Sequence, residues 1–547
     1  MNPELLVSHF DRISDAPDAL SRLRLFILNL AVRGKLVDQS KTERVSDEYL
    51  NEPVLDPFPA NWRVLNFGKF CDIQGGNQPP KSQFVNEPRL GYVRLFQIRD
   101  LGESPVPTYI PVGSTNRFCR KGEILIGRYG ASVGKVFWAQ EGAYNVALAK
   151  FLYPENTLIP EFAFLVLKSN LFQEKLAAAT RSAQAGFNKG DLAKITIPLP
   201  PLSEQHRIIA KVDELMALCN RLEELHTDVR SRSHQLTAAS LNRLTNDTNA
   251  EAVRQHANSY LDQFPRMTKN CEQIEMLRKT IRNLAIRGKL VPQDPKDEPA
   301  SELLKRLQNK KANSQAALPE IPADTMPFAL PSGWQWVRFG QLITDADAGW
   351  SPKSEGFPRS GDKWGVLKVS AVSWNKFLPD ENKQLLPEVV PPERAQVHRG
   401  DFLISRANTS ELVAKCVVVE EEPVNLILSD KIVRLQIAEE CSKEFICMVN
   451  NHAVHARSYY AGEASGTSLS MKNVSRAVIY ALAVPLAPAA EQRRIVDKVG
   501  ELMSLCDRLE EQLITRQVGT SKFLEAVLDA SLRDQPISED ELSVANG

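Results

Sequence analysis

Two segments of the chain carry apolar residues at the spacing of a long helix with one buried face. Successive apolar positions are separated by four, three, four and three residues in both, which is the pattern of a coiled-coil seam. The seam positions are Ile208, Val212, Leu215, Cys219 and Leu222 in the first segment, and Ile495, Val499, Leu502, Cys506 and Leu509 in the second. If residues 204–244 form one straight helix, it is about 60 Å long. Ser203 is the predicted N-cap of this helix.

Two shorter segments, 23–39 and 277–293, also show a helical spacing of apolar residues. Both contain the pattern N-L-A-[VI]-R-G-K-L-V, with glycine at Gly34 and Gly288. A glycine directly after the last apolar position is typical of a helix that ends with a left-handed residue. We therefore predict two further helices, each closed by its glycine.

The regions between these helices, 54–200 and 328–487, contain short β-rich runs separated by turn residues. Examples are GYVRLFQI, GEILIG and AKITIPL in the first region, and DFLIS, AKCVVV and KIVRLQI in the second. Residues 160–179 are predicted to be helical. Both regions are expected to be mixed α/β modules.

The chain is an internal duplication, because four segments recur in the same order. The N-L-A pattern recurs at an offset of 254 residues (Asn29 to Asn283), and FPANWRVLNFG recurs as LPSGWQWVRFG at 272 (Trp62 to Trp334). RKGEILIGRYG recurs as HRGDFLISRAN at 278. PLSEQHRIIAKVDELMALCNRLEE recurs as PAAEQRRIVDKVGELMSLCDRLEE at 287. Similar ends around dissimilar middles indicate one scaffold that carries two modules with different specificities.

We therefore predict an α+β (mixed) fold, in which two α/β modules are joined by long antiparallel coiled-coil helices with a pseudo-twofold internal repeat. The predicted boundaries are a helical segment at 1–50, the first module at 54–200, a central helical region at 201–300, a linker at 301–327, the second module at 328–487, and a C-terminal helix at 488–535.

Composition excludes several classes of protein. The 547 residues include 67 basic and 67 acidic side chains and are 43% apolar, as in an ordinary globular protein. No run is long and apolar enough for a membrane span, and residues 1–20 do not have the pattern of a signal peptide, so a cytoplasmic location is expected. The eight cysteines form no C-x-x-C pair, which argues against disulfide and metal frameworks.

Catalytic motifs are not evident. The sequence has no phosphate-binding G-x-x-x-x-G-K-[ST] loop. Residues 77–80 (NQPP) differ in order from the N-P-P-Y loop of amino-methyltransferases, and residues 379–383 (PDENK) do not have the acid spacing of metal-dependent nucleases. The chain is therefore not expected to be an enzyme, and no residue is predicted to be catalytic or to bind a metal.

Charge and side-chain chemistry favour nucleic acid. Residues 54–200 contain 17 Lys/Arg and 11 Asp/Glu, a net of +6, whereas residues 328–487 contain 17 and 18, a net of −1. Arginine is suited to guanine and amides to adenine, whereas lysine more often holds phosphate. The candidate DNA contacts are loop and strand-end residues at corresponding places of the two modules: Gln74, Asn77, Lys81, Arg94, Gln97, Arg99, Arg128, Tyr129, Gln184, Asn188 and Lys189, and Ser351, Lys353, Lys368, Ser370, Trp374, Lys376, Arg406, Asn408, Lys472 and Asn473.

With its doubled P-L-x-x-x-E-Q-x-R-I and N-L-A-x-R-G-K-L-V segments around two dissimilar modules, the chain resembles the specificity subunits of type I restriction–modification systems. The resemblance implies two target recognition domains, each reading one half of a bipartite, asymmetric site in double-stranded DNA. It also implies helices that set the spacing and dock two modification subunits, which bind S-adenosylmethionine, together with ATP- and Mg²⁺-dependent restriction subunits. This chain would then carry no cofactor of its own. Two alternatives remain open: a coiled-coil scaffold with protein-binding modules, and a catalytic methyltransferase or nuclease.

Overall fold

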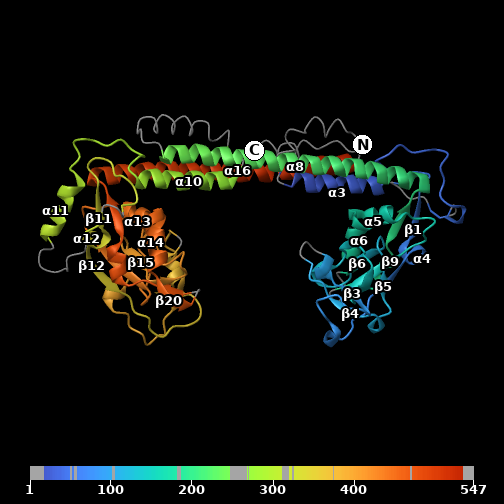
Figure 1. Ribbon diagram of the computed structural model, residues 1–547, viewed down its shortest axis with the longest axis horizontal. Coiled ribbons are helices and arrows are strands. Elements are labelled where there is room, and N and C mark those ends of the chain that lie inside the picture. The colour runs from blue at the N-terminus through green and yellow to red at the C-terminus, as the bar shows by residue number, and fades with distance from the viewer. Residues whose placement is uncertain are drawn as a thin grey trace. The chain divides into compact units, whose positions relative to one another are not determined.

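The computed structural model describes residues 16, 18–49, 52–53, 58–101, 105–180, 186–246, 268, 270–310, 320–322, 326–373, 375–468 and 471–533. The chain forms two compact units, of which the first comprises residues 1–230 and 515–547 and the second residues 231–514. Each unit contains one module and parts of the long helices (Figure 1).

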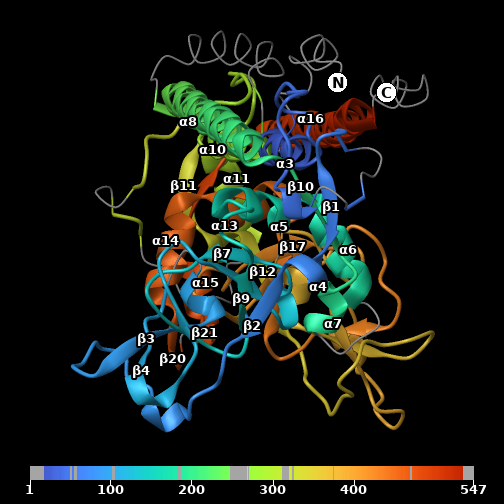
Figure 2. The same cartoon turned by 90° about the vertical axis from the view of Figure 1, so that its right-hand side faces the viewer.

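In the first unit, helix α3 (Ala19–Val32) precedes the module, and α8 (Leu202–Asn246) follows it. The module is enclosed by an antiparallel pair of strands, β1 (Arg63–Asn66) and β10 (Thr196–Leu199). Its central antiparallel sheet has the order β2-β9-β6-β7: Asp72–Gly75, Leu148–Leu152, Ile124–Gly127 and Val136–Trp138. A second sheet has the order β4-β3-β8-β5: Tyr109–Pro111, Tyr92–Phe96, Gly142–Tyr144 and Phe118–Cys119. The helices are α4 (Phe67–Phe70), α5 (Pro160–Lys168), α6 (Asn170–Thr180) and α7 (Lys189–Leu192). In both views β3 and β4 lie at the end of the module away from α8 (Figures 1 and 2).

The second unit repeats this plan. Helices α10 (Cys271–Ile286) and α11 (Ala300–Lys310) precede the module, and α16 (Ala489–Arg533) follows it. Strands β11 (Gln335–Arg338) and β22 (Ala483–Leu486) pair at its base, and the central sheet has the order β12-β19-β15-β17: Ile343–Ala348, Ile432–Ile437, Phe402–Ser405 and Cys416–Val418. The remaining strands are β14 (Asn382–Gln384), β13 (Gly365–Leu367) and β18 (Leu426–Ile427), and β16 (Ala407–Asn408), β21 (Met471–Asn473) and β20 (Ser465–Ser468). The helices are α12 (Phe339–Leu342), α13 (Lys443–His452), α14 (Val454–Glu463) and α15 (Arg476–Ala481).

The two modules share one fold although their sequences differ. Both central sheets are antiparallel and have the same strand order, and in both modules a parallel pair, β3 with β8 or β13 with β18, lies beside the central sheet. The duplication therefore extends through the middles that the sequence comparison could not align. The prediction of a mixed α/β fold with an internal repeat is confirmed.

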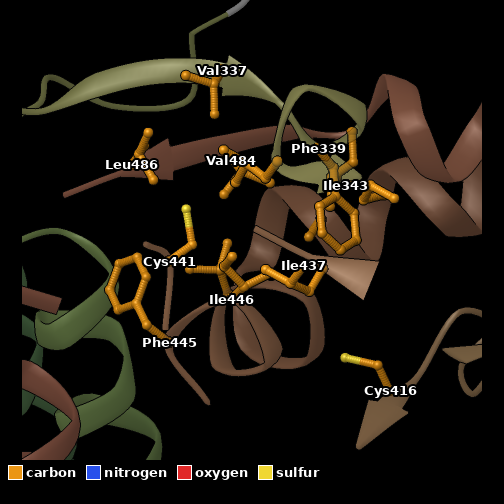
Figure 3. Packing of buried hydrophobic residues seen from close by; sticks show 14 of the residues in the cluster. Val337, Phe339, Ile343, Cys416, Ile437, Cys441, Phe445, Ile446, Val484 and Leu486 are labelled. Atoms are coloured by element: carbon orange, nitrogen blue, oxygen red, sulfur yellow. The ribbon is translucent and has the colours of Figure 1, made fainter. Parts of the chain in front are cut away.

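The second module's core runs directly into its long helix. Val337 and Val484 from the base strands pack with Phe445 and Ile446 of α13 (Figure 3). The same buried cluster includes Ile495 of α16. In the first unit Ile208 of α8 is likewise part of the module core. Module and helix therefore share one hydrophobic core in each unit.

The seam residues of the long helices pack against the shorter helices within each unit. In the first unit Ile208, Val212 and Cys219 are buried in the cluster that contains Ile27 and Ala31 of α3. In the second, Leu502 and Cys506 pack with α10, while Val499 and Leu509 lie partly buried beside them. The spacing of apolar residues identified the buried face of each long helix but not the helix that packs against it. Antiparallel pairing of α8 with α16 stays a prediction.

Each short helix also packs against the far end of the other long helix. Phe26 and Leu30 of α3 are buried with Phe523 and Leu524 of α16 in the first unit. Ile274 of α10 is buried with Leu241 of α8 in the second. Each unit therefore contains pieces of both long helices held by one short helix.

Other local predictions had mixed outcomes. Gly34 and Gly288 follow α3 and α10 with φ of 69° and 68°, which confirms the left-handed ends. Ser203 as N-cap was wrong, because α8 already begins at Leu202. Residues 160–179 form two helices that break at Ser169, whose buried hydroxyl donates to the Val166 carbonyl at 2.6 Å. The predicted linker begins inside α11, whose buried leucines belong to the second core.

Candidate nucleic-acid interface and the joints that hold it

Three of the four repeated segments meet at one point in the first unit, beneath the module. The indole Nε1 of Trp62 donates to the Glu204 carboxylate at 2.8 Å, and both side chains are fully buried. A Cβ on Gly34 would lie 2.4 Å from Pro59 Cγ and 3.0 Å from the Trp62 ring. The glycine is therefore required both for its left-handed backbone and for the space that the tryptophan occupies.

The second unit repeats this contact. Trp334 Nε1 donates to Glu491 at 3.0 Å, and a Cβ on Gly288 would lie 2.8 Å from the Trp334 ring. Gln293 also donates to Glu491, at 3.0 Å. Burial is the largest influence on the Glu491 carboxyl and raises its pKa, in spite of these two donors. We call the two sites the Gly–Trp–Glu joints: Gly34, Trp62 and Glu204, and Gly288, Trp334 and Glu491.

The residues that follow each glutamate extend the joints. The Gln205 amide accepts from the Ile159 backbone N–H at 2.8 Å, at the start of α5, and Gln492 accepts from the Ser442 N–H at 2.8 Å, at the start of α13. Arg207 pairs with Glu43, an interaction that lowers the pKa of the Glu43 carboxyl. In the second unit Arg494 pairs with Asp297. In both units the glutamine of the repeated E-Q-x-R therefore joins the long helix to the module, and the arginine joins it to an acidic residue that precedes the module.

A repeated ion pair links each short helix to its long helix. Arg24 donates to Glu223 at 2.6 Å and to Asn220 at 2.8 Å. Arg278 donates to Asp507 at 2.6 Å and to Glu510 at 2.8 Å. These contacts fix the rotation of the helices at corresponding positions in both units.

Several candidate DNA contacts of the first module lie along β2. Arg128 lies across this strand, because a Cβ on Gly75 would be 2.4 Å from its Nη1. Tyr129 forms a backbone bridge with Gly186, and Lys189 pairs with Asp72 at 2.6 Å. The β2 surface comprises Gln74, Arg128, Tyr129, Asn188 and Lys189. This surface combines a guanidinium, two amides, an ammonium group and an aromatic ring that is 44% exposed.

The candidates on this surface are partly held by structural contacts. The Gln74 amide oxygen accepts from the Tyr144 hydroxyl at 3.0 Å. Asn188 caps α7 by accepting from the backbone N–H groups of Gly190 and Asp191. The Arg128 guanidinium lies 5.1 Å from the centroid of the Tyr129 ring. Arg128 and Tyr129 therefore lie together on this surface.

The remaining candidate DNA contacts of the first module lie outside the β2 surface. Gln97 and Arg99 both donate to the Thr108 hydroxyl at 3.2 Å. Asn77 accepts from the Thr115 hydroxyl, and Lys81 is exposed. Arg94 lies against Phe96, with its guanidinium carbon 5.0 Å from the ring centroid. Gln184 lies outside the described residues.

In the second module, several of the candidate DNA contacts interact with acidic side chains. Ser370 donates to Glu381 at 2.6 Å, and Lys368 lies 3.7 Å from the same carboxylate, whose pKa these contacts lower. Ser351 donates to Asp430 at 2.6 Å. Sequence reasoning did not anticipate either acid.

The counterpart of the β2 surface lies where β16 pairs with β21. Val474 N–H donates to the Arg406 carbonyl at 2.9 Å, and in the first module Phe187 N–H donates to the Arg128 carbonyl at 3.3 Å. Asn408 donates to the Ser373 hydroxyl at 2.8 Å, and Lys472 donates to the Gly466 carbonyl at 2.7 Å. Lys353, Lys376 and Asn473 are exposed, and Trp374 lies outside the described residues.

Within the described ranges, no three His, Cys, Asp or Glu side chains are placed to hold a metal ion. In the same part of the chain, no helix has the length and hydropathy needed to cross a membrane.

The chain is similar to known proteins in sequence and fold. Residues 59–228 match the family described as "Type I restriction modification DNA specificity domain". The chain is 28% identical to the specificity subunit of the Escherichia coli type I restriction enzyme EcoEI over 564 aligned residues, and 28% identical to that of EcoAI over 574, with 94% of each chain covered in both alignments. A chain solved in a study of complex assembly and conformational transition of the type I R-M system has a similar fold, with a TM-score of 0.51, 17% identity, and coverage of 87% of this chain and 98% of that one. Along 94% of its length the chain is therefore similar to the specificity subunits of type I restriction enzymes, and its residues 59–228 match the DNA specificity domain of these systems.

Proposed function

We propose that each module reads one half of a bipartite, asymmetric DNA sequence, and that the helices fix the distance between the halves and dock two modification subunits. The observation that carries this proposal is the repetition of one fold on one joint, with different side chains at the corresponding surfaces. The Gly–Trp–Glu joints have the same tryptophan–glutamate hydrogen bond in both units. Two different surfaces, each held by the same kind of joint, are expected of two modules that recognise DNA independently.

The surfaces differ in a way that suits different half-sites. Arg128 and Tyr129 of the first module correspond to Arg406 and Ala407 of the second, so at this position the first module has an exposed aromatic ring and the second has alanine. The net charge of the first module is also more positive. A basic surface favours phosphate contacts, and arginine beside a groove favours guanine. The second module has a net charge near zero and therefore depends more on its partner subunits for DNA affinity.

The long helices support a spacing role by their length. Helices α8 and α16 each contain 45 residues, which corresponds to about 68 Å at 1.5 Å per residue. One turn of DNA is about 34–36 Å, so a helix of this length matches a separation of about two turns.

Helix α8 also has apolar residues that its own unit leaves exposed. Leu218, Leu225 and Val229 are 52%, 52% and 55% exposed and are spaced by seven and four residues, so they lie on one face. Exposed apolar side chains in a helical stripe are suited to a helix of another protein. We assign this stripe to docking of a modification subunit. On this proposal S-adenosylmethionine binds to the modification subunits, and ATP and Mg²⁺ bind to restriction subunits.

Deleting one heptad from the middle of α8 tests the spacing role. The deletion shortens this helix by about 10 Å. The expected result is a changed spacer between the methylated half-sites, or loss of methylation. Methylation that keeps both its level and its spacer would contradict the role of the helices as a spacer.

The competing scaffold hypothesis predicts no DNA selectivity. Binding of a randomised duplex library to the chain and its modification subunit is measured at about 50 and about 200 mM salt. Charge screening is weak at the lower concentration and strong at the higher one. The proposed function predicts enrichment of a two-part motif and affinity that falls steeply with salt. Equal binding of all duplexes would favour the scaffold.

A further inference from the structure

The first module contains a cavity that neither the joint nor the β2 surface uses. Its volume is about 460 Å³, and its walls include Arg94, Phe96, Asp100, Phe137, Trp138 and Phe164. The residues come from β3, the turn after it, β7 and α5, so strands and a helix far apart in sequence form its walls.

Two polar side chains in the walls of this cavity each have a buried atom without a hydrogen-bond partner. Asp100 is only 6% exposed; one carboxylate oxygen accepts from the Gln97 backbone N–H at 2.9 Å, and the other is buried without a hydrogen bond. The Nε of Arg94 is also buried without a hydrogen-bond acceptor. Buried polar atoms are nearly always hydrogen-bonded in folded proteins, so these atoms indicate a ligand that supplies a donor to Asp100 and an acceptor to Arg94.

The remaining walls suit a flat ring. Trp138 and Phe164 are stacked, with their centroids 4.3 Å apart and an interplanar angle of 9°, and Trp138 is 38% exposed. Phe96 and Phe137 add two more aromatic side chains. The wall residue Arg94 disfavours a positively charged ligand, as does Lys168 nearby, whose Nζ lies 4.7 Å from the Phe164 centroid.

The second module does not have these groups. The strand register places Val418 opposite Phe402, as Trp138 is opposite Ile124, so Val417 and Val418 correspond to Phe137 and Trp138. Ala371 corresponds to Asp100, because both follow the same backbone turn after the third strand. The carboxylate and the aromatic wall therefore belong to the first module alone.

We propose that this cavity binds one unstacked nucleobase that carries an exocyclic amino group, supplied by the DNA that the first module reads. The amino group donates to the free oxygen of Asp100, a ring nitrogen or carbonyl accepts from Arg94, and the base stacks on the aromatic wall. Adenine, cytosine and guanine carry such a group, whereas thymine does not. The inference rests on the proposed function, because the base comes from the recognised half-site.

Saturation-transfer NMR of the full chain with each of the four deoxynucleoside monophosphates tests the pocket. The three nucleotides with amino groups are expected to bind, and thymidine monophosphate is not. Asp100→Asn keeps the bond to the Gln97 N–H and turns an amide N–H₂ into the cavity, so the preference should shift to thymidine monophosphate. Trp138→Val, the residue that the second module has there, should weaken binding about 5- to 150-fold, because base–aromatic stacking contributes on this scale. Glu141→Gln, an exposed neighbouring carboxylate, is the control and should change nothing.

Duplexes that carry the methylated motif identify the source of the base. Asp100→Asn and Trp138→Val should each weaken binding of the cognate duplex about tenfold, while base changes in the second half-site retain their effects. The inference is overturned if no nucleotide binds, if all four bind equally, if Asp100→Asn keeps the original preference, or if the variants lose nucleotides but keep full affinity for DNA. The proposed function fails separately, if the unmodified chain with its partner shows no sequence selectivity.

Discussion

Replacing Trp62 by phenylalanine removes the indole N–H that the buried Glu204 carboxylate accepts at 2.8 Å. The only other side-chain donor to this carboxylate among the described residues is Asn61, at 2.9 Å. A hydrogen bond to a charged group contributes about 1.5–3 kcal/mol, and the smaller ring leaves additional empty space. We expect Trp62→Phe to lower the opening free energy of the first unit by about 3 kcal/mol.

Hydrogen exchange followed by mass spectrometry is the appropriate assay, because a chain of two units has no single unfolding free energy. Peptides covering β1 and α4 should exchange faster in Trp62→Phe, and peptides covering β11 and α12 should not. Trp334→Phe should show the reverse, since Trp334 donates to Glu491 at 3.0 Å. Trp350→Phe, in which the ring is 42% exposed, serves as a control that should change exchange by less than about 0.5 kcal/mol.

A double-mutant cycle with Glu204→Gln isolates the charged hydrogen bond. In the glutamine background the cost of Trp62→Phe should fall by about 1.5 kcal/mol or more, because the acceptor is no longer charged. A coupling below about 0.5 kcal/mol, or equal loosening of both units by Trp62→Phe, would refute the argument that the joint fastens one module to its own helix.

Three further predictions follow from other contacts. Gly34→Ala should destabilise the first unit by more than about 1 kcal/mol, because φ is 69° and Pro59 leaves no room for a Cβ, whereas Gly500→Ala on open α16 should stabilise by about 0.5–1 kcal/mol; exchange rates check both. Arg278→Ala should speed exchange in α10 by removing the contacts with Asp507 and Glu510, and an unchanged rate would show that the pair is dispensable. Burial lowers the pKa of Lys415 from 10.5 to about 8. Because the unfolded chain then binds more protons between pH 8 and 10.5, the second unit should gain stability as pH rises through this range. Urea denaturation at several pH values, followed through the exchange of peptides that cover α13 and β17 of the second unit, should show a smaller rise in stability for Lys415→Met than for the unmodified chain.

The repeats predicted much of the fold, because each repeated residue has a local physical reason. Gly34 and Gly288 end helices in the left-handed conformation, and the apolar spacing of the long helices identified their buried faces. Periodicity carries no information about the partner, so it did not reveal that Cys219 packs with α3 and Cys506 with α10. The convergence of Trp62 on Glu204 was also hidden, because 142 residues separate them.

The candidate interface was predicted less completely. Residue type and position found Arg128 and Tyr129, which do lie together with β2. The same reasoning chose Lys368 and Ser370 without seeing Glu381, which approaches them only through the pairing of β13 with β14. It also missed Trp138, because its stacking partner Phe164 comes from a helix that packs on the strand only after folding.

Exchanging residues 54–200 for the corresponding module of another specificity subunit, followed by single-molecule sequencing of methylated DNA from cells that also carry the partner subunits, tests independent reading most directly. The account predicts a new motif in which one half changes while the other half and the spacer stay the same. A motif in which both halves change would contradict it.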